Sequence, residues 1–159
     1  MYFYGCSNVT SITFGPNYQG IKDNDAQMFA GCSSLTTIAG MPAPTTTFIP
    51  YGWVSGCTNL TTIGNWQTLD TITAYREGCF SNCNKLPLNI DLTPVTLVRG
   101  KAFYQCYKMN FIGTLDANLT DSQEAFVGCD LSNCTMTLNT TTGINKYPFK
   151  NAKLPSVLT

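Results

Sequence analysis

The sequence contains no histidine, and only 11% of its 159 residues are charged. Without histidine, the chain lacks the usual general base of a nucleophilic active site and the commonest metal ligand in proteins. Nine basic and nine acidic residues give a formal net charge of zero. The basic surface typical of proteins that bind nucleic acid or anionic membranes is therefore not expected.

Long apolar segments are also missing. No stretch approaches the roughly 18 consecutive apolar residues of a membrane-spanning helix, and residues 1–6 show no basic segment leading into an apolar one. We therefore expect neither membrane insertion nor a signal peptide in this stretch of chain. The apolar content of 43% is nevertheless enough for one hydrophobic core, so we expect a single domain over residues 1–159.

What the sequence does contain is a repeat. Six cysteines follow one another at intervals of 26, 25, 26, 23 and 23 residues, and a further step of 23 reaches Ala152. A large apolar residue, six times out of seven phenylalanine, precedes each of these positions by three residues. The residue directly before each position is Gly, Asn or Gln, mostly types that tolerate positive φ. The cysteines of the series are Cys6, Cys32, Cys57, Cys83, Cys106 and Cys129.

After each corner the sequence reads apolar, two residues, apolar, as in Leu35 to Ile38 and Leu60 to Ile63. Thr and β-branched residues fill these short stretches, which favours strands of three to five residues. Pro and Gly elsewhere in each unit predict turns and brief helical turns. Because one unit cannot bury its own apolar face, its stability must come from stacking on its neighbours.

Residues 29–38, FAGCSSLTTI, resemble the unit of the BspA-type leucine-rich repeat, which reads roughly A-F-x-x-C-x-x-L-x-x-I. Residues 54–63 and 101–106 repeat the pattern, and the resemblance extends over nearly the whole chain. It implies an α/β solenoid of the leucine-rich-repeat type with about seven coils of 23–26 residues. Short parallel strands would form one face, and turns with short helical segments the other.

The two ends of the chain lack the capping segments expected of a complete solenoid. The first unit begins at Phe3 with no capping segment, and the last stops directly after its expected strand. Solenoids need polar caps for solubility. We therefore expect the chain to be a fragment of a longer one.

Eight cysteines invite three interpretations: free thiols in apolar columns, disulfides, or zinc ligands such as the pair Cys79 and Cys83. Every cysteine fits an apolar column of the repeat, and a buried thiol packs as a small hydrophobe with a weak donor. In adjacent coils the Cβ vectors of such a column run parallel, whereas a disulfide needs them to converge. The free-thiol interpretation is favoured, and no metal or cofactor is expected.

No catalytic constellation is recognisable. Serine and threonine are plentiful, but no activating base accompanies them, and residues 23–25, DND, lack the glycine and distal glutamate of a calcium loop. The chain is therefore not expected to be an enzyme. Five N-glycosylation sequons are present, at Asn8, Asn59, Asn118, Asn133 and Asn139. Two interpretations are open: they are glycan acceptors of a secreted protein, or they arise by chance from the composition of the chain.

The resemblance also implies a function and a location, since the family occurs mainly in surface and secreted proteins of gut and oral bacteria and some protists. It implies an extracellular or cell-surface adhesion module that binds a protein or glycan on another cell or host. The alternative is a structural spacer that contacts only its own neighbouring domains, or a decoration repeat in a larger surface or phage particle.

Strand alternation predicts where such a partner would bind. With Ile38 and Ile63 inward, Thr37 and Thr62 point outward, and the same register exposes the apolar cluster Leu88, Ile90 and Phe111. The cluster resembles an interaction site.

A one-residue slip after Pro87 would instead turn Leu88, Ile90 and Leu92 inward and leave Phe111 alone. This slip is slightly favoured because Asn89 would otherwise be buried. The Thr37 and Thr62 face is then the remaining candidate. The core is expected to contain Phe103, Cys106, Met109 and Ile112, with Gln105 at positive φ.

Overall fold

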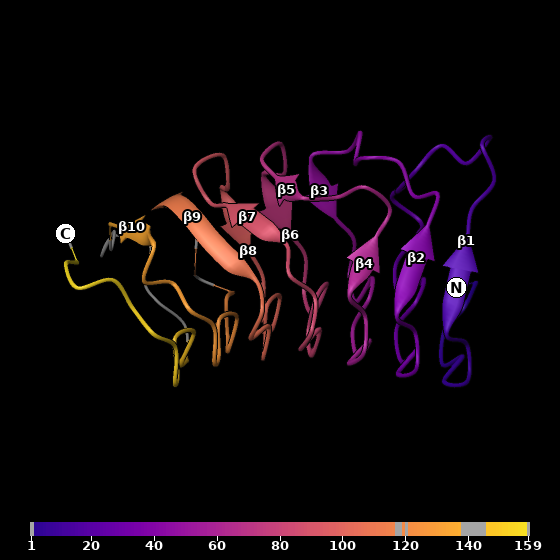
Figure 1. The fold of residues 1–159 in the computed structure, drawn as a ribbon. Helices are drawn as coiled ribbons and strands as arrows, with labels where there is room; N and C mark the ends of the chain where they lie inside the picture. The colour runs from indigo at the N-terminus through magenta and orange to yellow at the C-terminus, as the bar shows by residue number, and fades with distance from the viewer. Residues whose placement is uncertain (1, 117–118, 120, 138–145, 159) are drawn as a thin grey trace.

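The computed structural model describes residues 2–116, 119, 121–137 and 146–158. Within these residues the chain winds as a parallel β-solenoid of about five turns, with the strands following one another along one axis from N- to C-terminus (Figure 1). The strands are β1 (Ser11–Thr13), β2 (Thr37–Ala39), β3 (Phe48–Ile49), β4 (Thr62–Ile63), β5 (Thr68–Leu69), β6 (Ala74–Tyr75), β7 (Asn89–Asp91), β8 (Leu97–Val98), β9 (Asn110–Leu115) and β10 (Cys134–Met136).

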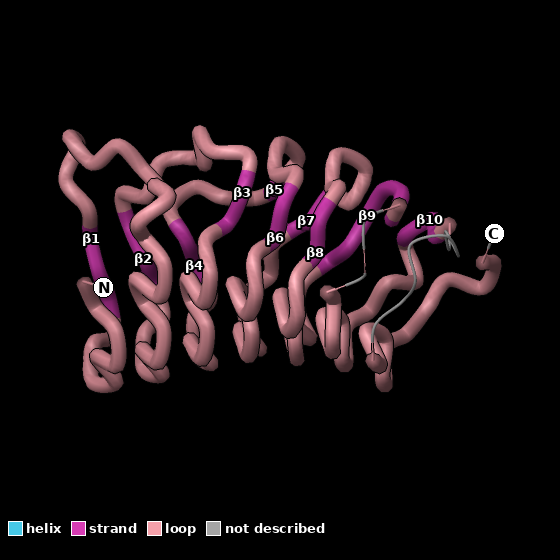
Figure 2. Tube along the Cα trace, turned by 180° about the vertical axis from the view of Figure 1, so that it is seen from behind, coloured by secondary structure: helices cyan, strands magenta, loops and turns pink. Residues whose placement is uncertain are grey.

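The strands form three parallel sheets. The first has the order β1-β2-β4, and the second has the order β10-β9-β7-β5. The third, β3-β6-β8, belongs to the opposite wall and is best followed from behind (Figure 2). Each strand is two to six residues long, so the sheets depend on stacking between units rather than on strand length.

The solenoid agrees with the expected leucine-rich-repeat architecture, but the α/β class is not confirmed, because the described residues contain no helix. No helix long and apolar enough to cross a membrane is found among these residues. About five turns are found instead of seven coils. One reason is that the last unit, residues 146–158, contributes only the isolated bridges Asp130–Lys153 and Met136–Leu158 instead of a strand.

In place of helical turns, the opposite wall carries the third sheet. Ile49, Tyr75 and Val98 point into the core from β3, β6 and β8. Two residues before each of them stands a threonine, and the hydroxyls of Thr73 and Thr96 donate to the backbone carbonyl of the preceding unit's threonine at 3.1 and 3.2 Å. Strand formation here needs only two in-register residues per unit.

The predicted corners are confirmed. All seven residues before the cysteine series have φ between 57° and 78°, including Gln105 at 57°. At each of the first six corners, the backbone N–H of the corner residue donates to a carbonyl of the following unit, as from Gly31 to Ser55 O at 2.7 Å. The left-handed conformation thus turns the chain while keeping these donors aligned with the next coil. The seven corner residues are Gly5, Gly31, Gly56, Asn82, Gln105, Gly128 and Asn151.

A continuous aromatic stack fills the core above the corners. Phe103 lies between Phe80 and Phe126, with ring centroids 6.0 and 5.4 Å away. Where the phenylalanine column is interrupted by Val54, the neighbouring Trp53 enters the core and makes edge contacts with Phe29 and Phe80 at 5.7 and 6.3 Å. The aromatic column therefore continues through this unit, although the ring comes from the residue one position earlier in the repeat.

The slip in the fourth unit is confirmed. Leu88, Ile90 and Leu92 are buried, and Asn89 points outward. The slip continues into β9, where Ile90 pairs with Phe111 and Asp91 pairs with Ile112. Phe103, Cys106 and Met109 are buried as expected. The expectation that Ile112 would be buried is wrong, because parallel pairing aligns Phe111 with the buried Ile90 and leaves Ile112 half-exposed.

Candidate binding surface on the first sheet

The first sheet positions the two threonines that sequence alternation places outward. Thr37 pairs with Thr62, and Ile38 pairs with Ile63. Both isoleucines are buried, whereas Thr62 is exposed and Thr37 is half-exposed. Burial of the isoleucines fixes the register, and the register orients the threonines.

A shallow depression of about 320 Å³ lies on this face, between the segments that leave β2 and β4. Its lining combines hydroxyl and amide groups with small apolar surfaces and includes no charged side chain. We call it the threonine depression; it is lined by Thr37, Ala39, Gly40, Met41, Pro42, Thr62, Gly64 and Asn65.

The depression exists because two chain segments cross closely where the strands end. Gly64 has φ of 47°, and a Cβ there would lie 2.1 Å from the backbone oxygen of Met41. Its N–H donates to Ile38 O at 2.6 Å. The indole N–H of Trp66 then fixes the upper turn by donating to Pro42 O at 2.8 Å. A glycine is required at residue 64 by both conformation and space.

The hydroxyls on this face divide into two groups. Those of Thr36 and Thr61 donate to Thr10 O and Thr36 O at 2.9 and 3.0 Å, so they reinforce the stacking of units. Those of Thr37 and Thr62 have no hydrogen-bond partner among the described residues. These two hydroxyls, unlike those of Thr36 and Thr61, are free to bind a ligand.

An asparagine ladder continues the polar face over the second sheet, and sequence reasoning missed it. The side-chain amide of Asn110 donates to Asn89 at 3.0 Å, and that of Asn133 donates to Asn110 at 3.1 Å. The spacings of 21 and 23 residues would have been the available signal. Because these amides bind one another, they stabilise adjacent strands and have less capacity for an external ligand.

The predicted apolar patch of Leu88, Ile90 and Phe111 is wrong. All three side chains are in the core, with relative exposures of 2%, 0% and 0%. Outward orientation of Leu88 and Ile90 would have placed the Asn89 amide in the core, whereas the observed register leaves it to bind Asn110 at the surface. Phe111 contacts Phe103 edge-on at 5.1 Å. The threonine face is thus the candidate that remains.

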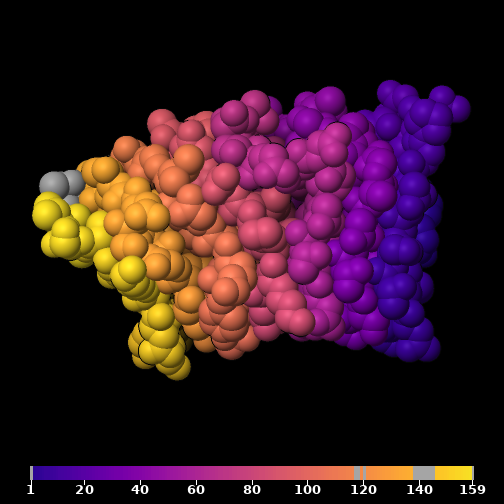
Figure 3. All heavy atoms as spheres, viewed as in Figure 1, coloured from indigo at the N-terminus to yellow at the C-terminus, as the bar shows by residue number. Residues whose placement is uncertain are grey.

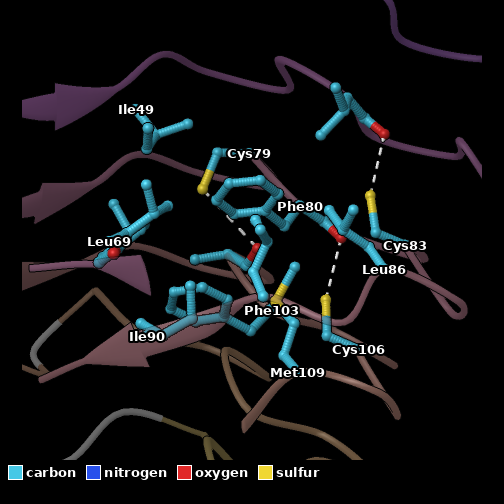
Figure 4. Close-up of a cluster of buried hydrophobic side chains, with 14 of the residues drawn as sticks. Ile49, Leu69, Cys79, Phe80, Cys83, Leu86, Ile90, Phe103, Cys106 and Met109 are labelled. Atoms are coloured by element: carbon cyan, nitrogen blue, oxygen red, sulfur yellow. Dashed lines mark hydrogen bonds between the residues drawn. The ribbon is translucent and has the colours of Figure 1, made fainter. Parts of the chain in front are cut away.

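The cysteine column stabilises the stack from inside. The thiols of Cys57, Cys83 and Cys106 donate to backbone carbonyls of the preceding unit at 3.0–3.2 Å. Cys79, by contrast, donates toward the following unit, to Ala102 O at 3.7 Å. The thiols of Cys79 and Cys83 therefore donate hydrogen bonds in opposite directions along the solenoid axis (Figure 4). Among the described residues there is no group of three or more His, Cys, Asp or Glu side chains suited to a metal ion.

Burial makes these thiols poor nucleophiles, because desolvation disfavours the thiolate. It raises the pKa of Cys57 and of Cys129 to about 12, and it holds the pKa of Cys106 well above its ordinary value. Of the eight cysteines, Cys6 alone is half-exposed; the others are buried.

We predict that Ellman's reagent at pH 8 labels Cys6 of the native protein rapidly, while the other thiols react only at the rate of unfolding. Denaturation without reductant should expose eight free thiols. The Cys6→Ser variant is the control and should lose the fast phase. A fast phase that persists in this variant would contradict the burial of the other seven thiols, and markedly fewer than eight thiols after denaturation would contradict the free-thiol interpretation.

Three of the five sequons lie within the described residues. Asn8 and Asn133 are exposed. Asn59 is half-buried, and its amide nitrogen donates to Ser33 O at 2.9 Å while its oxygen accepts from the Lys85 ammonium at 2.7 Å. Glycosylation of Asn59 would therefore disrupt contacts between units. Asn118 and Asn139 lie outside the described residues.

Comparison with known proteins supports the repeat assignment. A family model described as a BspA type leucine rich repeat region matches residues 1–110 and 121–158 in six copies. No curated protein and no solved structure matches the chain.

Proposed function

Because the chain belongs to the BspA-type leucine-rich-repeat family, we propose that it is a non-enzymatic adhesion module. It acts outside the cell or at the cell surface and binds a protein or glycan of another cell or host. Repeat solenoids present extended surfaces suited to such binding. The threonine depression is the proposed contact site.

The observation that carries this proposal is the pair of unpaired hydroxyls beside uncharged apolar surface. Thr37 and Thr62 are adjacent across the sheet. Their side-chain hydroxyls have no hydrogen-bond partner among the described residues, while Ala39 and Pro42 supply apolar contact area nearby. Hydroxyls next to apolar surface suit a neutral, hydroxyl-rich or amide-rich partner. A strongly charged ligand would find no compensating charge in the depression.

The proposal is tested by measuring binding of the protein to an array of host-cell glycans and to immobilised host-cell surface proteins. Thr62→Lys places a long charged side chain at the depression and should weaken binding at least about tenfold, equivalent to about 1.4 kcal/mol. Thr135→Lys is the matched control, because Thr135 is also exposed on a strand but lies at β10.

Circular dichroism and the urea midpoint should be unchanged in both variants, since both sites are exposed. Equal binding by wild type and Thr62→Lys, or no binding by the wild type to any glycan or protein, would contradict the proposed function.

A further inference from the structure

A second column of left-handed residues runs along the corner edge of the solenoid. It lies five residues before each position of the cysteine series from Cys32 to Ala152, and its φ values are all between 55° and 61°. Most of these residues are not glycine, so the conformation belongs to the turn rather than to one residue type. The column consists of Gln27, Gly52, Gly78, Lys101, Glu124 and Tyr147.

The two left-handed columns enclose one tight turn per unit. The N–H of Ser55 donates to Gly52 O at 3.1 Å, and other units repeat this bond. Adjacent turns are joined by bonds such as that from the Gly52 N–H to Glu77 O at 2.9 Å. The turns form the lower edge of the space-filling view, from the indigo unit to the yellow one (Figure 3). Side chains at equivalent positions of these turns are therefore neighbours along the axis, at about the 4.8 Å spacing of paired strands.

Small residues leave this edge open over three units. Ala30, Ser55 and Ser81 stand two residues before their cysteines, where the fifth unit carries a tyrosine. Gly52 and Gly78, in the left-handed column, add no side chain. A hollow of about 430 Å³ lies over these five residues, within the range of about 300–1,000 Å³ typical of small-molecule sites.

A second hollow, of about 440 Å³, adjoins the first at a glycine. Tyr51, Glu77, Gly100 and Gln123 occupy equivalent positions, one residue before the left-handed column. Gly100 therefore leaves a gap between two polar side chains of this row. Glu77 and Lys101 line both hollows, so the two form one groove. We call it the corner groove; its main polar and aromatic lining residues are Gln27, Tyr51, Glu77, Arg99, Lys101 and Gln123.

The polar groups of the corner groove have unused hydrogen-bonding capacity. Gln27, Glu77 and Gln123 line it, and their side chains form no hydrogen bond or ion pair with any described residue. The same holds for the hydroxyl of Ser55. An amide side chain both donates and accepts, a hydroxyl does the same, and a carboxylate accepts. These groups suit a ligand that offers hydroxyl donors and acceptors at short intervals.

Charge in the corner groove is balanced. The Arg99 guanidinium is ion-paired with the Asp121 carboxylate, and the Lys101 ammonium lies 3.6 Å from the Glu124 carboxylate. An anionic ligand would have to compete with these two carboxylates for the cations. The remaining acid, Glu77, shares both hollows with Lys101, and a carboxylate accepts strong hydrogen bonds from hydroxyl groups. A hydroxyl-rich ligand without net charge therefore fits best.

Tyr51 supplies the apolar surface that such a ligand needs. Its side chain is 45% exposed and neighbours Glu77 in the row. A tyrosine ring combines an apolar face with a polar tip. The C–H groups of a sugar ring pack on an apolar face of this kind, while the hydroxyls around the sugar ring reach polar side chains at the rim.

We propose that the corner groove binds a neutral oligosaccharide. One sugar ring lies on Tyr51, with its hydroxyls bound by Gln27 and Glu77, and the adjoining sugar ring enters the second hollow beside Gly100. The corner groove shares no residue with the threonine depression. It is thus a second binding site with its own ligand class, and it does not depend on binding at the threonine depression.

Isothermal titration calorimetry with neutral di- and trisaccharides of glucose, galactose, mannose and N-acetylglucosamine tests the proposal. The wild type should bind at least one of them. Tyr51→Ala removes the stacking surface and Gly100→Leu fills the second hollow, so each should weaken binding at least about tenfold. Gly100 is not left-handed, and a Cβ there would meet its nearest atom, Gln123 O, at 3.4 Å. The leucine variant should therefore fold, which circular dichroism checks.

Two controls separate the corner groove from other surfaces. Tyr107→Ala removes a tyrosine that is 51% exposed and lines neither hollow, and it should bind like the wild type. Thr62→Lys, at the threonine depression, should also bind the saccharide normally. Acidic saccharides and amino sugars are titrated alongside, and the wild type should bind them more weakly than the neutral ones.

Three results would overturn the proposal. The first is a wild type that binds none of the neutral saccharides, or that prefers the charged ones. The second is unchanged binding by both Tyr51→Ala and Gly100→Leu. The third is loss of saccharide binding in Thr62→Lys alone, which would place the saccharide at the threonine depression and so support the proposed function while refuting a site in the corner groove.

Discussion

Replacement of Phe103 by alanine is expected to lower the free energy of unfolding by about 3–5 kcal/mol. The ring is fully buried and continues the aromatic stack in both directions along the solenoid axis. Removing it leaves a cavity that the flanking backbone cannot close, because the adjacent units are held apart at the spacing of their hydrogen bonds. Four aromatic rings would lose contacts: Tyr75, Phe80, Phe111 and Phe126.

Equilibrium urea denaturation measures this loss. Tyr51→Ala is the control, because it removes a ring of similar size that is 45% exposed, and it should cost about 1 kcal/mol or less. A loss below about 1 kcal/mol for Phe103→Ala would mean that the aromatic column does not form the core in solution.

The second large effect is expected at a glycine. Gly64→Ala should destabilise the protein by about 3–5 kcal/mol, combining left-handed backbone strain with a collision between chain segments. The added methyl would lie 2.1 Å from a backbone oxygen, that of Met41, which cannot move as a flexible side chain can. Relief requires the two segments to separate, which weakens the hydrogen bond from Gly64 to Ile38.

Gly5→Ala separates the two contributions. Gly5 also has positive φ, 72°, but its Cβ would meet nothing within 4 Å. Its cost should therefore be the conformational one alone, about 1–2 kcal/mol. If urea denaturation gives equal losses for the two variants, the close crossing at Gly64 is absent in solution, and the floor of the threonine depression with it.

The features that repeat could be predicted from the sequence. Corner residues as different as Gly31, Asn82 and Gln105 were assigned positive φ because they share one position in the repeat, and all adopt it. The outward orientation of Thr62 followed from the inward orientation of Ile63. In both cases neighbouring units provide several independent instances of the same physical requirement.

The strand register in the middle of the chain could not be predicted from the sequence alone. There, apolar residues occupy both the odd and the even positions of a strand, so alternation does not say which of them point into the core. Phe111 and Ile112 are adjacent, and either could enter the core on hydrophobicity alone. Pairing with Ile90 decides between them, and that pairing depends on the slip after Pro87. The third sheet escaped prediction for a related reason, since two residues per strand are too few to show a period.

The candidate site was only half predictable. Strand alternation placed Thr37 and Thr62 at the surface, but it carries no information on the shape of that surface. The hollow beside them depends on how closely the segment at Gly64 approaches Met41. That approach is a tertiary contact between two turns, and neither turn specifies it alone.

The unit-by-unit hydrogen bonding also has a mechanical consequence. Each corner bonds only to the units before and after it, so a pulling force applied along the axis is resisted by one junction at a time. The last unit pairs with its neighbour through two isolated bridges and corner hydrogen bonds rather than through a strand, and it should unwind first. Each coil of 23 to 26 residues that unwinds releases about 75–95 Å of chain. A solenoid built in this way lengthens in steps under load, which limits the tension transmitted along it.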